Sequence, residues 1–150
     1  MTDNIFATNN TDEARKLLAN AIKTENIDHS LLVDDHGEKV DIFNTEEQVR
    51  KYNEIVSFGG FHTEEDAYTA LQGCMIALFD DISDWMTSNQ VSKTFYMQSE
   101  MPIGYVIDNN GNKADVTSIK LSLHKERGNN TELGFFVSSF HPIAENKMGQ

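Results

Sequence analysis

Apolar residues recur at helical spacing in three stretches of the first ninety residues. A polar side chain that can cap a helix precedes each stretch: Thr11, Asn44 and Thr63 are candidate N-caps, and Glu47 completes a capping-box pattern with Asn44. Residues 1–10 are polar without a period, and we expect them to be loose. The pattern predicts helices over 12–24, 45–55 and 64–87, the last with a broad apolar stripe that should pack in the core.

After residue 89 the apolar residues change to the alternation of strands. Ile119 and Leu121, for example, alternate with the polar Lys120 and Ser122. Turn-forming clusters at 108–112 and 127–130 predict hairpins, and Gly59–Gly60 predicts a break in the chain. The predicted strands are 93–98, 103–108, 116–125 and 133–140. This order predicts an α+β fold, with N-terminal helices packed on a C-terminal antiparallel sheet, in a single domain over residues 1–150.

Charge is distributed unevenly along the chain. The 150 residues hold 12 Lys and Arg against 24 Asp and Glu, a formal net charge of -12. Residues 1–100 hold 7 basic and 19 acidic residues, whereas residues 101–150 hold 5 of each, so the helical part carries the whole excess. From residue 52 to residue 92 there are seven acids and no Lys or Arg. Such a run is typical of a solvated helix face, and it would also suit a basic docking partner.

Several classes of protein are not expected. The lone Cys74 cannot form an intramolecular disulfide, and its place on the apolar stripe predicts a small buried hydrophobe. There is no 18-residue apolar run, and the N-terminus lacks the basic start and apolar stretch of a signal peptide. Phosphate-binding glycine loops and GxSxG are missing, and no two of the five histidines have the i, i+4 spacing of a helical zinc site. We therefore expect no membrane segment, no metal and no other cofactor.

His141 is the histidine with the most suggestive context. It closes Gly134–Pro142, which reads as an aromatic strand that stops at a proline. Strand alternation places Ser139 and His141 on one face of the sheet. A hydroxyl and an imidazole placed in this way could bind a phosphate oxygen and transfer a proton. An ordinary strand end is the alternative that these residues leave open.

From Gly60 onward the order of motifs resembles the ribonuclease A-like toxin domains at the C-termini of bacterial contact-dependent inhibition proteins and other polymorphic toxins. Those domains show a Phe-Thr-acid segment, an alanine-rich helix with a Trp near its end, an Ile-Gly strand, a hairpin, and an aromatic strand ending in Thr/Ser-x-Tyr/His-Pro. The matching segments here are Phe61–Glu64, Ala67–Ala77, Trp85, Ile103–Val106, Val116–Leu123 and Gly134–Pro142.

Upstream, the family pattern has a His-Val-Gly-Lys stretch, followed about a dozen residues later by an arginine. The segment from His36 to Lys39 (HGEK) resembles the first, although the Val is missing, and Arg50 resembles the second. His29 competes with His36 for the same role. The resemblance implies a catalytic set of His36, Arg50, Ser139 and His141, with Lys39 as a secondary, substrate-binding cation.

The resemblance also implies what this set would do. The fold would be ribonuclease A-like without disulfides, and the activity a metal-independent endoribonuclease. One imidazole would take the proton of the ribose 2′-OH and the other would protonate the departing 5′ oxygen, while Arg50 and Ser139 stabilise the charge on phosphorus. The implied partners are an RNA substrate and a cognate immunity protein. The domain would be a monomer, secreted as part of a larger toxin or effector and delivered to the target-cell cytoplasm, where a fold without disulfides suits the reducing conditions.

Two other interpretations stay open. The chain could be a small acidic immunity or inhibitor protein that neutralises a basic nuclease by complementary charge. It could also be a diverged member of the toxin fold that has lost its activity, because the upstream histidine motif is imperfect.

Overall fold

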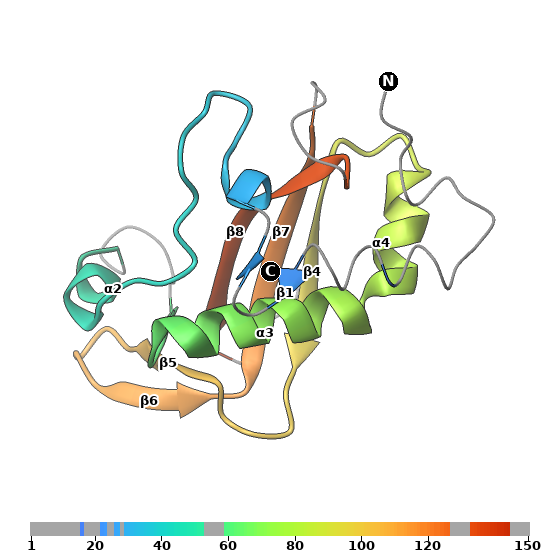
Figure 1. The fold of residues 1–150 in the computed structure, drawn as a ribbon. Helices are drawn as coiled ribbons and strands as arrows, with labels where there is room; N and C mark the ends of the chain where they lie inside the picture. The colour runs from blue at the N-terminus through green and yellow to red at the C-terminus, as the bar shows by residue number, and fades with distance from the viewer. Residues whose placement is uncertain are drawn as a thin grey trace.

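The computed structural model describes residues 16, 22–23, 26–27, 29–52, 59–126 and 133–144, and these form an α+β fold as predicted (Figure 1). No helix in these ranges is both long enough and apolar enough to cross a membrane. The helical elements are the 3-10 helix η2 (His29–Leu32) and the α-helices α2 (Glu46–Tyr52), α3 (Glu64–Ala77) and α4 (Phe79–Met86). The strands are β1 (Ile22–Lys23), β2 (Asn26–Ile27), β3 (Gly59–Phe61), β4 (Ser92–Gln98), β5 (Gly104–Ile107), β6 (Lys113–Val116), β7 (Ser118–Lys125) and β8 (Phe135–Ile143).

The strands after β2 form two three-stranded antiparallel sheets. The main sheet has the order β4-β7-β8, and the small sheet has the order β3-β5-β6. The strand predicted over 116–125 is divided at Thr117, because β6 pairs with β5 in the small sheet and β7 pairs within the main sheet. Gly59–Gly60, predicted to be a break, is instead part of strand β3 and pairs with β5. The 108–112 turn joins β5 to β6 as predicted, and the 127–130 turn lies outside the described residues.

Before residue 60 the observed helices and strands differ from the predicted ones in their boundaries. Most of the helix predicted over 12–24, like the loose segment 1–10, lies outside the described residues. Its last part is wrong, because Ile22–Lys23 is strand β1 and pairs antiparallel with β2. Helix α2 starts one residue later than predicted, with Thr45 as its N-cap. The Thr45 N–H donates to Gln48 Oε1 at 2.8 Å and the Gln48 N–H donates to Thr45 Oγ1 at 3.3 Å, which is a capping box.

The long helix predicted over 64–87 is present as two helices. Its start is confirmed, because the Asp66 N–H donates to Thr63 Oγ1 at 3.0 Å and three acids lie in the first turn. At Leu78 the backbone leaves helical geometry, and α4 follows at once.

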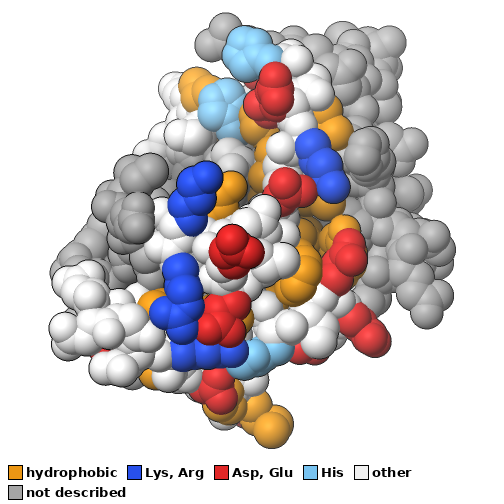
Figure 2. All heavy atoms as spheres, turned by 90° about the vertical axis from the view of Figure 1, so that its left-hand side faces the viewer, with side chains coloured by type: hydrophobic (Ala, Val, Ile, Leu, Met, Phe, Trp, Pro, Cys, Tyr) orange, Lys and Arg blue, Asp and Glu red, His pale blue; other side chains and the backbone are white. Residues whose placement is uncertain are grey.

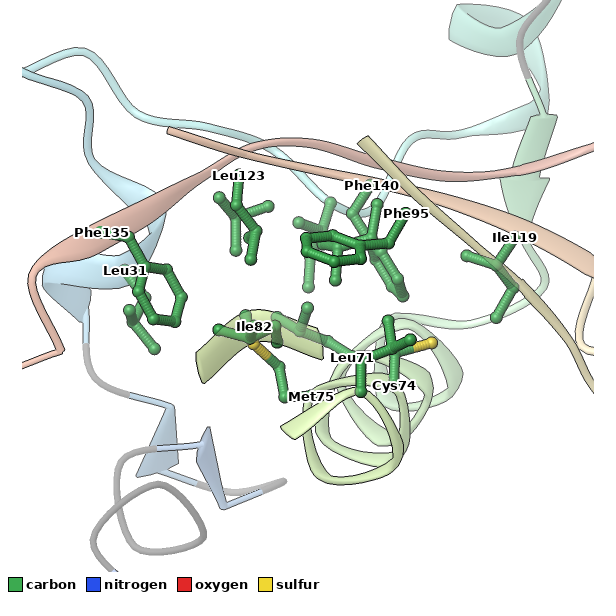
Figure 3. Close-up of a cluster of buried hydrophobic side chains, with 14 of the residues drawn as sticks. Leu31, Leu71, Cys74, Met75, Ile82, Phe95, Ile119, Leu123, Phe135 and Phe140 are labelled. Carbon is green, nitrogen blue, oxygen red and sulfur yellow. The ribbon is translucent and has the colours of Figure 1, made fainter. Parts of the chain in front are cut away.

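These two helices cover one face of the main sheet (Figures 1 and 3). Leu71 and Met75 of α3 and Ile82 of α4 are fully buried in the core between helices and sheet. Trp85 lies edge-on to Phe95 and Phe135, with ring centroids 6.4 and 5.9 Å away. The remaining core positions of the sheet include Ile119, Leu121, Leu123, Val137 and Phe140.

The small sheet meets the edge of the main sheet at Pro142. A Cβ atom on Gly59 would overlap the Pro142 carbonyl oxygen, and one on Gly104 would overlap the Pro142 ring. Phe61 and Phe140 stack in the adjoining core, with ring centroids 5.2 Å apart. The two sheets can therefore approach closely only because Gly59 and Gly104 have no side chains. The contact lies at Pro142, the residue that follows His141.

We expect Gly59→Ala to lower the free energy of unfolding by about 1–3 kcal/mol, because the new methyl group would push the sheets apart. Urea denaturation followed by circular dichroism measures the change. Gly73→Ala is the matched control: Gly73 is exposed on α3, a Cβ added there would meet nothing within 4 Å, and alanine should raise stability by up to about 1 kcal/mol. Equal urea midpoints for Gly59→Ala and the unmutated protein would contradict the contact.

Candidate functional site

The face of the main sheet that points away from α3 and α4, which we call the outer face, is mostly polar. Paired residues of antiparallel strands share a face, and the core side carries Phe95, Leu121 and Phe140. The outer face therefore carries the alternate residues. Its rows across β4, β7 and β8 are Gln98–Ser118–Ile143, Tyr96–Lys120–His141, Thr94–Ser122–Ser139 and Ser92–His124–Phe136.

The main sheet contains no acidic residue, although the chain as a whole is strongly acidic. Its three strands hold three lysines and two histidines, and no Asp or Glu. By contrast, α3 and α4 together hold six acids and no Lys or Arg. The face at the left of Figure 1 is different again, because basic and acidic side chains are interleaved on it (Figure 2). The main sheet is thus a region of locally positive character.

A β-bulge at Ser138 sets which residues of β8 reach the outer face. Leu123 pairs with Val137 and Ser122 pairs with Ser139, so Ser138 is the extra residue on β8. The Ser138 hydroxyl donates to the Ser122 carbonyl oxygen at 3.0 Å. Beyond the bulge the alternation resumes, and Ser139 and His141 share the outer face as the strand pattern predicts.

Strand β8 does not stop at the proline, which corrects the sequence prediction. It continues through Pro142 to Ile143, with Pro142 opposite Ile119. The reason is that β8 is the end strand of the main sheet, where a residue without an N–H is tolerated. His141 therefore lies within a strand, where its backbone is held by pairing with β7, rather than at a frayed end.

The His141 imidazole is held in one tautomer. Its Nδ1–H donates to the Pro142 carbonyl oxygen at 2.9 Å, and since a carbonyl can only accept, the lone pair lies on Nε2. The side chain is buried, with 7% of the residue exposed. Burial lowers the pKa of His141 and the Lys120 ammonium lowers it further, against the opposing effect of the hydrogen bond to Pro142. At neutral pH, Nε2 is therefore a proton acceptor.

Lys120 is a residue of the site that the sequence interpretation missed. It lies directly opposite His141 on β7, and its charge acts on the imidazole. The signal was present in the alternation of β7, which puts Lys120 on the polar side. What was lacking was the register with β8, because the bulge at Ser138 shifts the pairing by one residue.

Arg50 belongs to a different part of the molecule. Its Nη1 donates to the Gly111 carbonyl oxygen at 3.1 Å, and its Nη2 donates to Glu46 Oε1 at 2.8 Å. Lys113 donates to the other oxygen of the same carboxylate at 3.2 Å. Hydrogen bonds from Arg50 and Lys113 lower the pKa of Glu46. These contacts hold Arg50 between α2 and the β5–β6 turn, and they do not bring it onto the outer face.

His36 and Lys39 lie in an exposed turn that the Val33–Lys39 bridge closes. Asp34 Oδ1 accepts from the backbone N–H of His36 at 2.9 Å, and Lys39 pairs with Asp41 at 3.3 Å. His29, the competing candidate, begins η2, whose Leu31 and Leu32 are buried in the core with residues of β8. The backbone at His29 is thus anchored beside β8, whereas the anchoring contacts of His36 lie within its own turn.

A cavity of about 390 Å³ opens on the other side of the main sheet, between α3 and the residues that link β4 to β5. Cys74 lines it and is 4% exposed, and burial raises the pKa of its thiol to about 12, which fits the predicted buried hydrophobe. His62 also lines it and is paired with Asp115 at 3.0 Å. Met97 and Ile119 of the core side line this cavity, and Gln98, at the end of the last outer-face row, also borders it.

Within the described ranges, no group of three or more His, Cys, Asp or Glu side chains is arranged to hold a metal ion. No protein-family model matches the sequence, and no curated protein matches it. Among solved structures, the fold is similar to that of a chain in the crystal structure of the CdiA-CT/CdiI complex from Y. kristensenii 33638. The TM-score is 0.58 at 16% sequence identity, and the match covers 67% of this chain and 92% of that chain. At this identity the likeness shows a shared fold.

We expect Lys120→Ala to raise the pKa of His141, because removing the ammonium removes its repulsion of the imidazolium. Burial persists, so the pKa should stay below its ordinary value of about 6.5. Titration of the His141 ring protons by NMR, assigned with His141→Ala, measures the shift. Lys93→Ala is the control, because Lys93 pairs with Leu123 on the core side of the sheet.

The same lowered pKa has a consequence for stability. As the pH falls below about 6.5, the unfolded chain binds the His141 proton more readily than the folded chain, so this residue makes the fold less stable in acid.

An unchanged His141 titration in Lys120→Ala would contradict the electrostatic contact between the two side chains.

Proposed function

We propose that this protein is a metal-independent ribonuclease toxin that cleaves RNA by attack of the ribose 2′-OH on the adjacent phosphorus. The observation that carries the proposal is the His141 imidazole, buried on an acid-free sheet with its lone pair on Nε2 and with Lys120 opposite it. The fold shared with a chain of a CdiA-CT/CdiI complex supports the toxin class, together with the order of motifs from Gly60 to Pro142.

In the proposed reaction one imidazole takes the proton of the 2′-OH while that oxygen forms a bond to phosphorus. The bond from phosphorus to the 5′ oxygen breaks, and the second imidazole gives that oxygen a proton, leaving a 2′,3′-cyclic phosphate and a 5′-OH. His141 would fill one of the two roles, and His36 or His29 the other. The two proton transfers need no metal, since a neutral imidazole can accept a proton and an imidazolium can donate one.

The remaining side chains would stabilise the charge on phosphorus. Lys120 is the cation nearest to His141 in the register, and Ser139 offers a hydroxyl on the neighbouring row. Arg50 and Lys39 would contribute only if the substrate reaches the α2 side of the molecule, because each is already paired with a carboxylate. We therefore place Lys120 ahead of Arg50 as the main cation of the reaction.

The acidic helices suit the second part of the proposal, a cognate immunity protein as partner. In the similar solved structure the two chains named CdiA-CT and CdiI form a complex. By analogy, this chain would be delivered to the target-cell cytoplasm within a larger secreted protein and neutralised in the producing cell by its partner.

We expect His141→Ala to lower RNA cleavage by about 10²- to 10⁴-fold, the usual contribution of a positioned acid or base. The assay uses purified protein, bulk RNA and tRNA in EDTA, and it detects products with 2′,3′-cyclic phosphate ends. His62→Ala is the matched control, a histidine outside the outer face, and should cleave at the unmutated rate. Circular dichroism verifies that the variants are folded. If the unmutated protein, freed of any inhibitor, leaves RNA uncut, the proposal fails.

The same assay decides between the two candidates for the second imidazole. If His36 is the partner of His141, His36→Ala should lose activity to a similar extent and His29→Ala should keep it. The opposite result would transfer the role to His29, whose backbone is anchored beside β8. Full activity in both variants would exclude a second imidazole from this segment.

The net charge of -12, with six acids and no base on α3 and α4, favours one alternative function, that of an acidic inhibitor of a basic protein. Expression in a bacterial host separates the two. We expect induction of the unmutated protein to stop growth, and His141→Ala to restore it at equal protein levels. Growth unaffected by the unmutated protein would favour the inhibitor, or an inactive member of the fold.

A further inference from the structure

His124 and Phe136 form a fixed pair of rings at one end of the outer face. Their centroids are 5.2 Å apart and their planes are inclined by 27°, so the rings are stacked. Phe136 is buried, with 6% of the residue exposed, whereas His124 is only partly buried. The imidazole therefore covers the phenyl ring and keeps a part of its own surface in contact with solvent.

Two contacts fix the orientation of the His124 ring. Stacking on Phe136 fixes its plane, and its Nδ1–H donates to the Lys125 carbonyl oxygen at 2.7 Å. Since the carbonyl can only accept, Nε2 carries the lone pair in the neutral ring. This is the same tautomer and the same kind of hydrogen bond that His141 makes to Pro142.

The pair lies on the same face as the proposed site and in line with it. His124 is four residues from Lys120 along β7, a distance of about 13 Å at the rise of a strand. Hydroxyl groups occupy the row between them. Thr94 and Ser122 are hydrogen-bonded at 2.9 Å, and Ser139 lies opposite Ser122 on β8. No residue of these three strands is acidic, so nothing within the sheet repels a phosphodiester that crosses it.

We propose that the His124–Phe136 pair is a second RNA-binding position, which holds an unpaired nucleotide by its base while the phosphate to be cleaved lies at His141 and Lys120. A supported, partly exposed aromatic ring is a stacking surface for any base, and unpaired bases are the ones free to use it. The hydroxyl row would bind the sugar and phosphate groups between the two positions. This inference rests on the proposed ribonuclease function, and it makes unpaired RNA several nucleotides long the preferred substrate.

Binding is tested first, without any need for cleavage. The probe is a fluorescein-labelled, unstructured ten-nucleotide RNA, and its affinity for the full chain is measured by fluorescence anisotropy in a His141→Ala background. Adding His124→Ala, or Phe136→Leu, which keeps an apolar side chain but removes the ring, should raise Kd roughly tenfold, as expected for loss of one stacked base. Adding His62→Ala should leave Kd unchanged.

Kinetics then separate a binding position from a merely structural role. With catalytically intact protein, His124→Ala should raise KM for the ten-nucleotide RNA and leave kcat near the unmutated value. Cleavage of the dinucleoside monophosphate UpA, too short to span about 13 Å, should be unaffected.

These experiments distinguish failure of the second RNA-binding position from failure of the ribonuclease proposal. An unchanged Kd in His124→Ala overturns the second position whether or not the protein cleaves RNA. Equal losses on UpA and on the longer RNA also overturn it, because they indicate a general distortion of the sheet. A raised Kd in a protein that cleaves no RNA supports the position and overturns the ribonuclease.

Discussion

The close contact of two glycines with Pro142 is the constraint on which the arrangement of the molecule depends. Gly59 and Gly104 come from β3 and β5, and each presents bare backbone to the edge strand of the main sheet. Any side chain at either glycine would push the two sheets apart. Helix α2 would move together with the small sheet, because Val49 of α2 packs against Gly60 and Tyr105. The contact also immobilises the residue whose carbonyl orients His141. Sheet packing and imidazole orientation therefore depend on the same few atoms.

The distribution of charge over the folded structure explains how an acidic chain can carry a sheet that is free of acidic residues. Acidic residues are concentrated on α3 and α4, which cover one side of the main sheet, while the strands themselves contain none. An apolar core separates the two regions. At physiological ionic strength the screening length is about 8 Å, so exposed charges beyond the core contribute little to the potential at the outer face. Net charge is therefore a poor guide to what this face can bind.

Local patterns in the sequence were sufficient for much of the fold and for little of the site. The cap at Thr63, the alternation of Ile119, Leu121 and Leu123, and the 108–112 turn are encoded within a few residues, and each was predicted. Strand β3 was missed because its first residue, Gly59, lies against Pro142, which is more than 80 positions away in the sequence. Lys120 was missed for a similar reason, since only the register with β8 makes it a neighbour of His141.

The bulge at Ser138 has a consequence for the comparison of this chain with other chains of the same fold. Ser138 is an extra residue in β8, so the strand does not alternate regularly through this point. The core residues Phe135 and Val137 are therefore separated from the outer residues Ser139 and His141 by one position more than in a regular strand. A chain of this fold without the bulge would need one residue fewer to present the same two side chains on the same face. At 16% identity, an alignment that is anchored on the aromatic core and allows no gap would place the histidine one position out of register and on the wrong side of the sheet. Equivalent positions in this fold are therefore defined by strand pairing, and counting residues along the chain misidentifies them.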